Sequence, residues 1–178
     1  MLLAAGYDLG TATEDYLREQ KLLNFVDPAR ELLESFSDRL HFPVDVAVAA
    51  GADRLELKRK ALPTQELIVD IGRRTVEAYR SRIASAGTVF VNGPAGVYEN
   101  PVSAFGTREL WSAIAASPAF SVIGGGDSIA AARKFSVLDQ FSYVCTAGGG
   151  LVRFLAGERL PVVDALREAA VRFTETPS

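Results

Sequence analysis

The fold is decided by the stretch Phe120-Ser121-Val122-Ile123-Gly124-Gly125-Gly126-Asp127-Ser128. Its first half is a short apolar run with β-branched residues, which predicts a buried strand. Three glycines then predict a tight turn, and the aspartate that follows is typical of the first turn of a helix. The stretch therefore predicts one strand–turn–helix unit whose helix runs from Asp127 to about Phe135.

The same unit recurs along the chain. It is found at 67–72 before a helix at 73–85, at 88–94 before a helix at 105–116, and at 143–150 before a helix at 151–155. Strands that alternate with helices at this interval predict right-handed crossovers and a parallel sheet with helices on both faces. We therefore predict an α/β fold with three layers (α/β/α) and a mostly parallel, Rossmann-like sheet.

Other segments complete the predicted architecture. Alternating residues at 43–49 and 54–58, separated by a turn at Gly51, predict an added β-hairpin. Two helices are predicted before it, over about 13–23 and from Asp27 onward. A last helix is predicted from Pro161, with Val163, Leu166 and Ala170 facing inward. No linker divides the sequence, so residues 1–178 are expected to form a single domain.

Composition narrows the function classes. The 178 residues are 48% apolar and 23% charged, which is typical of a globular domain. With 19 basic against 22 acidic residues, the net charge of −3 gives no reason to expect a nucleic-acid or anionic-membrane partner. The single cysteine, Cys145, excludes an intrachain disulfide, and the single histidine argues against most zinc sites. No segment reaches the ~18 consecutive apolar residues of a membrane span, so a cytoplasmic location is expected.

Three glycine-rich segments follow predicted strands, where open parallel sheets bind their ligands. In the first, Gly124 to Ser128, bare amides at a helix start suit a phosphate. Asp127 either caps that helix or holds Mg²⁺ beside the phosphates, and spacing alone does not decide between these roles.

The second segment, Thr146 to Gly150, suits an outermost phosphoryl group, or is a tight turn. The third, Asn92 to Glu99, places an amide and a carboxylate on either side of a sugar phosphate, or is ordinary turn chemistry. Neither the Rossmann dinucleotide fingerprint nor a Walker-type P-loop is present.

Together with Asp70-Ile71-Gly72, Gly106-Thr107 and Phe154-Leu155-Ala156-Gly157, these segments resemble the C-terminal, nucleotide-binding domain of phosphoglycerate kinase, in its archaeal form. The resemblance covers essentially the whole chain. It implies the reversible, glycolytic transfer of a phosphoryl group from ATP to 3-phosphoglycerate, giving ADP and 1,3-bisphosphoglycerate, with Mg²⁺ as the cofactor.

The resemblance also implies roles for individual residues. The nucleotide would be bound by Asn92 near its phosphates, by Glu99 at the ribose, and by Val97 with Val69 around adenine. Pro94 is also expected to contact the nucleotide. The amides from Gly125 through Gly126 to Ser128 would hold phosphates, Gly124 would also contact the nucleotide, and Asp127 would bind the Mg²⁺ of Mg-ATP. Thr146, Gly148 and Gly149 would meet the transferring phosphoryl group and are the catalytic candidates.

The resemblance further implies that parts of the family are missing from this sequence. The N-terminal domain, which binds 3-phosphoglycerate, and the beginning of the nucleotide domain are both absent. The chain is therefore expected to be an incomplete nucleotide-binding domain that takes 3-phosphoglycerate only if an N-terminal domain is supplied. The alternative is a catalytically inactive nucleotide-binding fragment or remnant that needs a partner half. Ala147, in place of the family's usual first glycine of the last loop, is a small departure.

Overall fold

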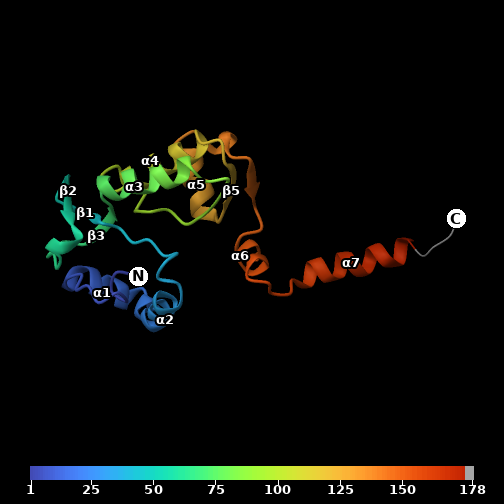
Figure 1. Ribbon diagram of the computed structural model, residues 1–178, viewed down its shortest axis with the longest axis horizontal. Coiled ribbons are helices and arrows are strands. Elements are labelled where there is room, and N and C mark those ends of the chain that lie inside the picture. Colours follow the sequence, from blue (N-terminus) through green and yellow to red (C-terminus); the bar gives the residue numbers. More distant parts are fainter. Residues whose placement is uncertain (175–178) are drawn as a thin grey trace.

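The computed structural model describes residues 1–174. Figure 1 shows two sheets flanked by helices, with one helix extending away from them. The helices are α1 (Thr11–Glu19), η1 (Leu22–Phe25), α2 (Val26–Phe36), η2 (Arg59–Ala61), α3 (Arg73–Ala84), α4 (Phe105–Ala115), α5 (Gly126–Lys134), η3 (Leu138–Gln140), α6 (Gly149–Leu155) and α7 (Pro161–Thr174). The strands are β1 (Asp45–Ala50), β2 (Asp53–Lys58), β3 (Ile68–Ile71), β4 (Thr88–Asn92), β5 (Phe120–Gly124) and β6 (Tyr143–Cys145).

Strands β4, β5 and β6 form a parallel sheet in that order. Its inner face carries Val91 and Ile123, which are 7% and 0% exposed and pack against apolar residues of α4 and α5. Trp111 of α4 joins the two helices, because its indole Nε1 donates a hydrogen bond to the Ser128 carbonyl at 3.1 Å. The predicted α/β fold with a parallel sheet is confirmed.

The opposite face of this sheet is more open. Phe90, Val122 and Tyr143 lie opposite one another in register, and Phe90 and Tyr143 are 41% and 56% exposed. Here α6 covers the end of β5, since a Cβ at Gly124 would lie 2.7 Å from the Leu151 side chain.

The other sheet is antiparallel, with the order β2-β1-β3. The predicted hairpin is confirmed as β1 and β2. The segment predicted at 67–72 is a strand, but it pairs with β1 and not with the parallel sheet, so that part of the prediction is wrong. Val46, Ala47 and Val48 are at most 2% exposed, so β1 is a central strand that needs a neighbour on each edge.

A buried carboxylate fixes the start of α3 against this sheet. Asp45 of β1 accepts hydrogen bonds from the backbone N–H groups of Arg74 (3.0 Å) and Thr75 (2.8 Å). The Thr75 hydroxyl donates a third bond to it at 2.6 Å. These bonds satisfy amides that every helix leaves unpaired in its first turn, so a distant strand supplies the cap.

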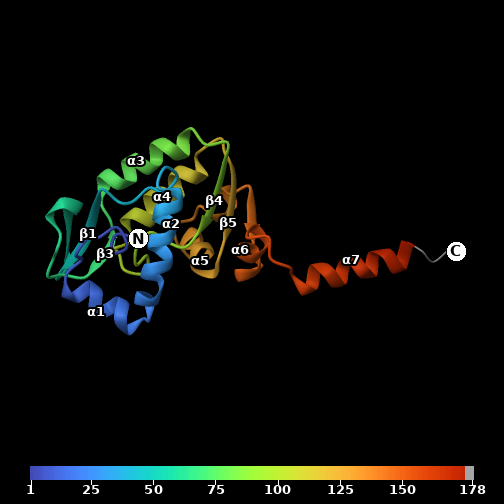
Figure 2. The same ribbon diagram turned by 60° about the horizontal axis from the view of Figure 1, so that its bottom comes forward.

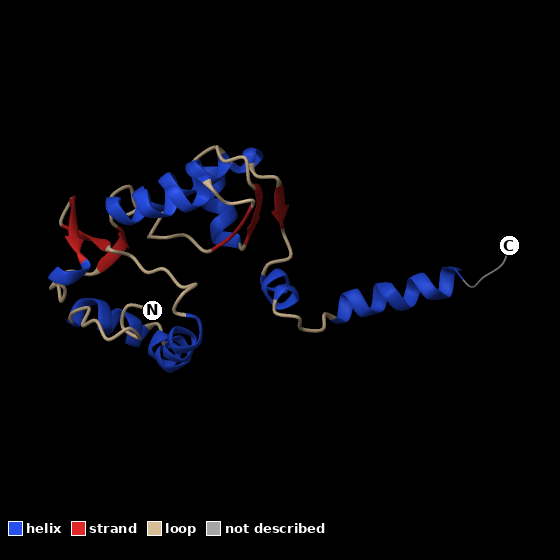
Figure 3. Cartoon of the chain, viewed as in Figure 1, coloured by secondary structure: helices blue, strands red, loops and turns tan. Residues whose placement is uncertain are grey.

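The last helix begins at Pro161 as predicted, but it does not face inward. Leu166 is 65% exposed and Ala170 is also exposed, while Val163 is half-buried. Figures 2 and 3 show α7 extending away from both sheets after α6. The predicted inward packing is therefore wrong, because the helix leaves the body of the molecule before its apolar side chains can reach a sheet. No helix in the described part of the chain is both long and apolar enough to cross a membrane.

Candidate functional site

The three glycine-rich segments leave the parallel sheet side by side. Asn92 of β4 pairs with Gly124 of β5, and Gly124 pairs with Cys145 of β6. All three strands therefore end in one row, and the loops that follow them emerge at the same edge. This is the edge at which open parallel sheets bind ligands.

The turn between β5 and α5 is closely fitted to Asn92. Gly125 has a φ of +90°, which L residues with a side chain rarely adopt. A Cβ at this position would also overlap the Asn92 side-chain oxygen. Gly126, the first residue of α5, has open space on its Cβ side within the described structure. The turn therefore presents bare backbone toward the edge of the sheet.

Ser128 of α5 forms a hydrogen bond to the loop that follows β4. Its side chain is fully buried, and its Oγ accepts a hydrogen bond from the Gly93 N–H at 2.6 Å. The hydroxyl is therefore engaged inside the protein. A contribution of Ser128 to phosphate binding, as predicted, would come from its backbone N–H.

Asp127 is exposed in the first turn of α5. The N-cap of α5 is Gly125, and no side-chain hydrogen bond caps this helix within the described residues. Of the two roles that spacing left open, capping is therefore not used. Across residues 1–174 no group of three or more His, Cys, Asp or Glu side chains could enclose a metal ion. A cation at Asp127 would need further oxygen ligands from a bound molecule, which is how Mg²⁺ commonly binds with phosphates.

The carboxylates of Glu99 and Asp127 both affect the Tyr98 phenol. Desolvation raises the pKa of the Tyr98 phenol, and the carboxylates of Glu99 and Asp127 raise it further. Both acids therefore lie close enough to Tyr98 to interact with it, although one belongs to the loop after β4 and the other to α5. The structure places these two predicted site residues on the same side of the molecule.

The loop from Gly93 to Ala104 is held in place by side chains outside it. Lys134 at the end of α5 donates from Nζ to the carbonyl oxygens of Tyr98 (2.9 Å) and Glu99 (2.8 Å). Lys134 was not among the residues predicted from the sequence. Its signal is its spacing, since it follows Asp127 by seven positions and so lies on the same face of the helix.

The predicted pair Val97 and Val69 is also brought together. The Val97 N–H donates a hydrogen bond to the Val69 carbonyl at 3.0 Å, and the Val97 side chain is 46% exposed. Pro94 is half-buried at the start of the same loop. An apolar surface beside β3 is thus available next to Glu99.

The segment after β6 is open backbone. Thr146, Gly148 and Gly149 are exposed, and Gly148 has a φ of +57°. No described heavy atom lies within 4 Å of a Cβ built at Gly148 or Gly149. Side chains therefore do not fill this junction. Its link to the other two segments is the pairing of Cys145 with Gly124 and the contact of Leu151 with Gly124.

Comparisons with known proteins identify relatives over nearly the whole chain. The family model described as phosphoglycerate kinase matches residues 1–158. The phosphoglycerate kinase of Methanopyrus kandleri is 47% identical over 165 residues, which is 93% of this chain and 41% of that protein. The phosphoglycerate kinase of Pyrococcus horikoshii is 41% identical over 177 residues, which is 97% of this chain and 43% of that protein.

Solved structures give the same result. The crystal structure of phosphoglycerate kinase from Pyrococcus horikoshii OT3 superposes with a TM-score of 0.85 at 41% identity, covering 93% of this chain and 42% of that one. The phosphoglycerate kinase of Coxiella burnetii superposes with a TM-score of 0.81 at 36% identity, covering 96% of this chain and 44% of that one. The chain thus spans less than half the length of the relatives it matches. With the matched sequence, the shared fold and the aligned strand ends taken together, the chain belongs to the phosphoglycerate kinase family.

Proposed function

We propose that this chain is the nucleotide-binding part of a phosphoglycerate kinase, forming an incomplete nucleotide-binding domain over residues 1–178. It would bind the Mg²⁺ complexes of ATP and ADP and serve the reversible transfer of a phosphoryl group between ATP and 3-phosphoglycerate, in cytoplasmic glycolysis. The observation that carries this proposal is the row formed by Asn92, Gly124 and Cys145, which gathers three glycine-rich junctions at one edge of the parallel sheet.

The phosphates would lie against bare backbone. The amides of Gly125, Gly126 and Ser128 and the positive end of α5 favour an anion. Gly124 lets the strand end lie close to α6, and Asn92 lies against the same turn. Because Asp127 would add a negative charge beside that anion, a cation between them would strengthen the binding. A single carboxylate completed by phosphate oxygens fits Mg²⁺.

The nucleoside would lie beside the loop that follows β4. Glu99 would accept hydrogen bonds from the ribose hydroxyls, and Val97 with Val69 would contact the base. This assignment is supported by the hydrogen bond that joins Val97 to Val69 and by the hydrogen bond from Lys134 of α5 to the Glu99 carbonyl. Pro94 would limit the movement of the loop between the phosphate and nucleoside ends.

Phosphoryl transfer needs positioning and charge neutralisation more than a protein nucleophile. Backbone amides at Thr146, Gly148 and Gly149 would provide donors for the transferring group. When bound, Mg²⁺ would neutralise phosphate charge. The matched relatives are more than twice as long as this chain, so 3-phosphoglycerate would be bound by a part of the family protein that lies outside this sequence.

We predict that Asp127→Ala weakens the binding of Mg-ADP more than that of metal-free ADP, because only the former uses the carboxylate as a metal ligand. Isothermal titration calorimetry with and without Mg²⁺ measures both affinities. Asp139→Ala is the matched control, since it removes an exposed carboxylate from η3, beyond the other end of α5. Equal weakening of both ligands would remove the metal role, and no heat with either ligand for the unmodified chain would reject nucleotide binding.

The chain spans less than half the length of its relatives. This supports a second candidate, a fragment that binds nucleotide but has no activity alone. The two candidates differ in their response to a partner half. The chain is mixed with a separately produced N-terminal half of a related phosphoglycerate kinase, and turnover coupled to ATP is measured. Turnover that appears only in the mixture supports the kinase, whereas an unchanged rate supports the inactive fragment.

A further inference from the structure

A buried ion pair lies between the antiparallel sheet and the loop of the candidate site. The side chain of Asp70, on β3, is 0% exposed, and that of Arg54, on β2, is 17% exposed. Arg54 Nη1 lies 2.9 Å from Asp70 Oδ2. Ion pairs buried to this extent carry a large desolvation cost, so the other bonds that the two groups make decide what the pair does.

Asp70 is packed between two segments of backbone. Its Oδ2 accepts a hydrogen bond from the Gly106 N–H at 2.8 Å, and its Oδ1 accepts one from the Ile71 N–H at 2.8 Å. A Cβ at either Gly96 or Gly106 would overlap the Asp70 carboxylate. The loop after β4 and the first turn of α4 therefore close directly onto this side chain, and only glycine permits the approach.

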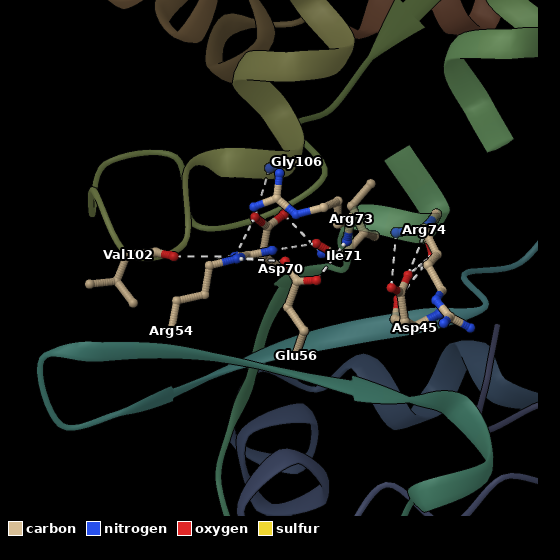
Figure 4. Close-up of polar contacts among 10 residues, drawn as sticks. Asp45, Arg54, Glu56, Asp70, Ile71, Arg73, Arg74, Val102 and Gly106 are labelled. Atoms are coloured by element: carbon tan, nitrogen blue, oxygen red, sulfur yellow. Dashed lines mark hydrogen bonds and ion pairs between the residues drawn. The ribbon is translucent and has the colours of Figure 1, made fainter. Parts of the chain in front are cut away.

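Arg54 extends the same contact toward the end of the loop. Nη1 also donates to the Val102 carbonyl at 3.2 Å, and Nη2 donates to the Ile71 carbonyl at 2.7 Å. Nε donates to Glu56 Oε1, on the same strand, at 3.3 Å. The guanidinium lies 5.0 Å from the centre of the Phe105 ring. Figure 4 shows Arg54 reaching from the hairpin to Asp70, with the Val102 carbonyl beside the Arg54 guanidinium and Gly106 beyond the Asp70 carboxylate.

The contact continues from α4 into the part of the loop that leads to the site. The Thr107 hydroxyl accepts hydrogen bonds from the N–H groups of Ala95 (3.1 Å) and Gly96 (3.2 Å). Thr107 is 0% exposed and follows Gly106 directly. Gly106 thus connects the ion pair to the residues just before Val97 and Glu99.

From this arrangement we infer that Arg54 and Asp70 are positioning residues, which hold the loop from Gly93 to Ala104 in the conformation that receives the nucleoside. Neither residue would touch the ligand. The part of the inference that concerns the ligand rests on the proposed function, whereas the part that concerns the loop does not. It assigns to the antiparallel hairpin a task at a site formed by the other sheet.

The two ends of the ligand give a selective test. The loop would contact the ribose and the base, while the turn at Gly125 would contact the phosphates. Loosening the loop should therefore weaken ADP binding and leave inorganic tripolyphosphate binding unchanged. General damage to the fold would weaken the binding of both ligands.

The variant Arg54→Met removes the guanidinium and keeps an unbranched apolar side chain of similar reach. Amide hydrogen exchange, detected by NMR, is followed at Ala95, Gly96, Val97 and Gly106, with the amides of β5 as the internal reference. Calorimetry with Mg-ADP and with Mg-tripolyphosphate follows on the same samples. Arg108→Met is the matched control, because Arg108 lies 5.9 Å from the same Phe105 ring but forms its ion pair with Glu109.

In Arg54→Met we expect the loop amides to exchange faster by about tenfold or more while the β5 amides are unchanged. ADP affinity should fall by about threefold to thirtyfold. The affinity of Arg54→Met for tripolyphosphate should stay the same. In Arg108→Met the exchange rates and both affinities should equal those of the unmodified chain. If Arg54→Met does not fold, Arg54→Lys is used, which keeps the charge beside Asp70 but cannot reach Asp70, Ile71 and Val102 at once. It should show a smaller effect of the same kind.

Equal acceleration of the loop and β5 amides, or an equal loss of both affinities, would overturn the inference and leave the pair a general stabiliser of the fold. Selective acceleration of the loop in a chain that binds neither ADP nor tripolyphosphate would support the positioning of the loop and reject the proposed function.

Discussion

Replacing Gly125 by alanine perturbs the turn before α5 in two ways that can be separated. With φ at +90° and ψ at 136°, the backbone lies in a region that side chains disfavour. The new Cβ would also overlap Asn92 Oδ1 and lie 3.5 Å from Asn92 Cγ. The substitution therefore strains the backbone and displaces the amide that the proposed function places near the phosphates.

The magnitude follows from these two contributions. Holding a residue with a side chain in this region costs on the order of 1–3 kcal/mol. Moving the exposed Asn92 side chain off its rotamer costs about 0.5–1.5 kcal/mol more. Gly93→Ala is the control for strain alone, because Gly93 has a φ of +97° and no described heavy atom within 4 Å of its Cβ position. Gly125→Ala should therefore lower the free energy of unfolding by roughly 1 kcal/mol more than Gly93→Ala does.

Urea denaturation gives the free energies of unfolding. It is applied to the unmodified chain, to the single variants Gly125→Ala, Gly93→Ala and Asn92→Ala, and to the double variant Asn92→Ala/Gly125→Ala. Removing the Asn92 side chain should relieve the overlap, so the double variant should be more stable than the sum of the single effects by roughly 1 kcal/mol. Additive effects of the two substitutions would refute the claim that Asn92 packs against this turn.

Two further predictions concern charges near the loop. Desolvation raises the pKa of Asp70 in the folded protein, while the N–H donors and Arg54 oppose that rise. Arg54→Met should therefore raise this pKa further and favour the protonated folded state. The variant's loss of unfolding free energy should be largest where Asp70 is ionised and should shrink as the pH falls toward the unfolded value of 3.8. Denaturation over about pH 3 to 8 checks this, and a loss that does not change with pH would contradict it. Lys134→Met should weaken Mg-ADP by about twofold to tenfold through the loss of its two hydrogen bonds to the loop. Calorimetry measures this against Lys60→Met, which removes an exposed lysine from η2, and the same affinity in both variants would reject the role of Lys134.

Local patterns were sufficient to predict the elements that carry the site. Each apolar run followed by glycine and an amphipathic segment became a strand and a helix, because side-chain periodicity and glycine turns act within a few residues. The shared edge of β4, β5 and β6 follows from parallel pairing. Which sheet receives a given strand is a long-range choice, and the residues of β3 fit either one. Its pairing with β1 was therefore not predictable from its own sequence.

The residues that hold the loop from Gly93 to Ala104 were not predicted, because they contact it from distant positions in the sequence. Arg54 and Asp70 are separated by sixteen positions, and Lys134 lies thirty-five positions after Glu99. Nothing in the spacing of Arg54 distinguishes it from the other charged residues on the outer strand of a hairpin. The error in α7 has another origin, since an amphipathic pattern predicts a face to be covered but does not identify the surface that covers it.

The two sheets therefore contribute differently to the candidate site. The parallel sheet determines where the strand ends lie, because its register aligns Asn92, Gly124 and Cys145. The loop between β4 and α4 is attached through side chains and carbonyls that belong to β2, β3, α4 and α5. A segment containing only β4 to α6 would keep the aligned strand ends but lose the attachments from Arg54, Val69 and Asp70. The phosphate side of the site thus depends on local backbone geometry, whereas the nucleoside side depends on the hairpin being folded against it.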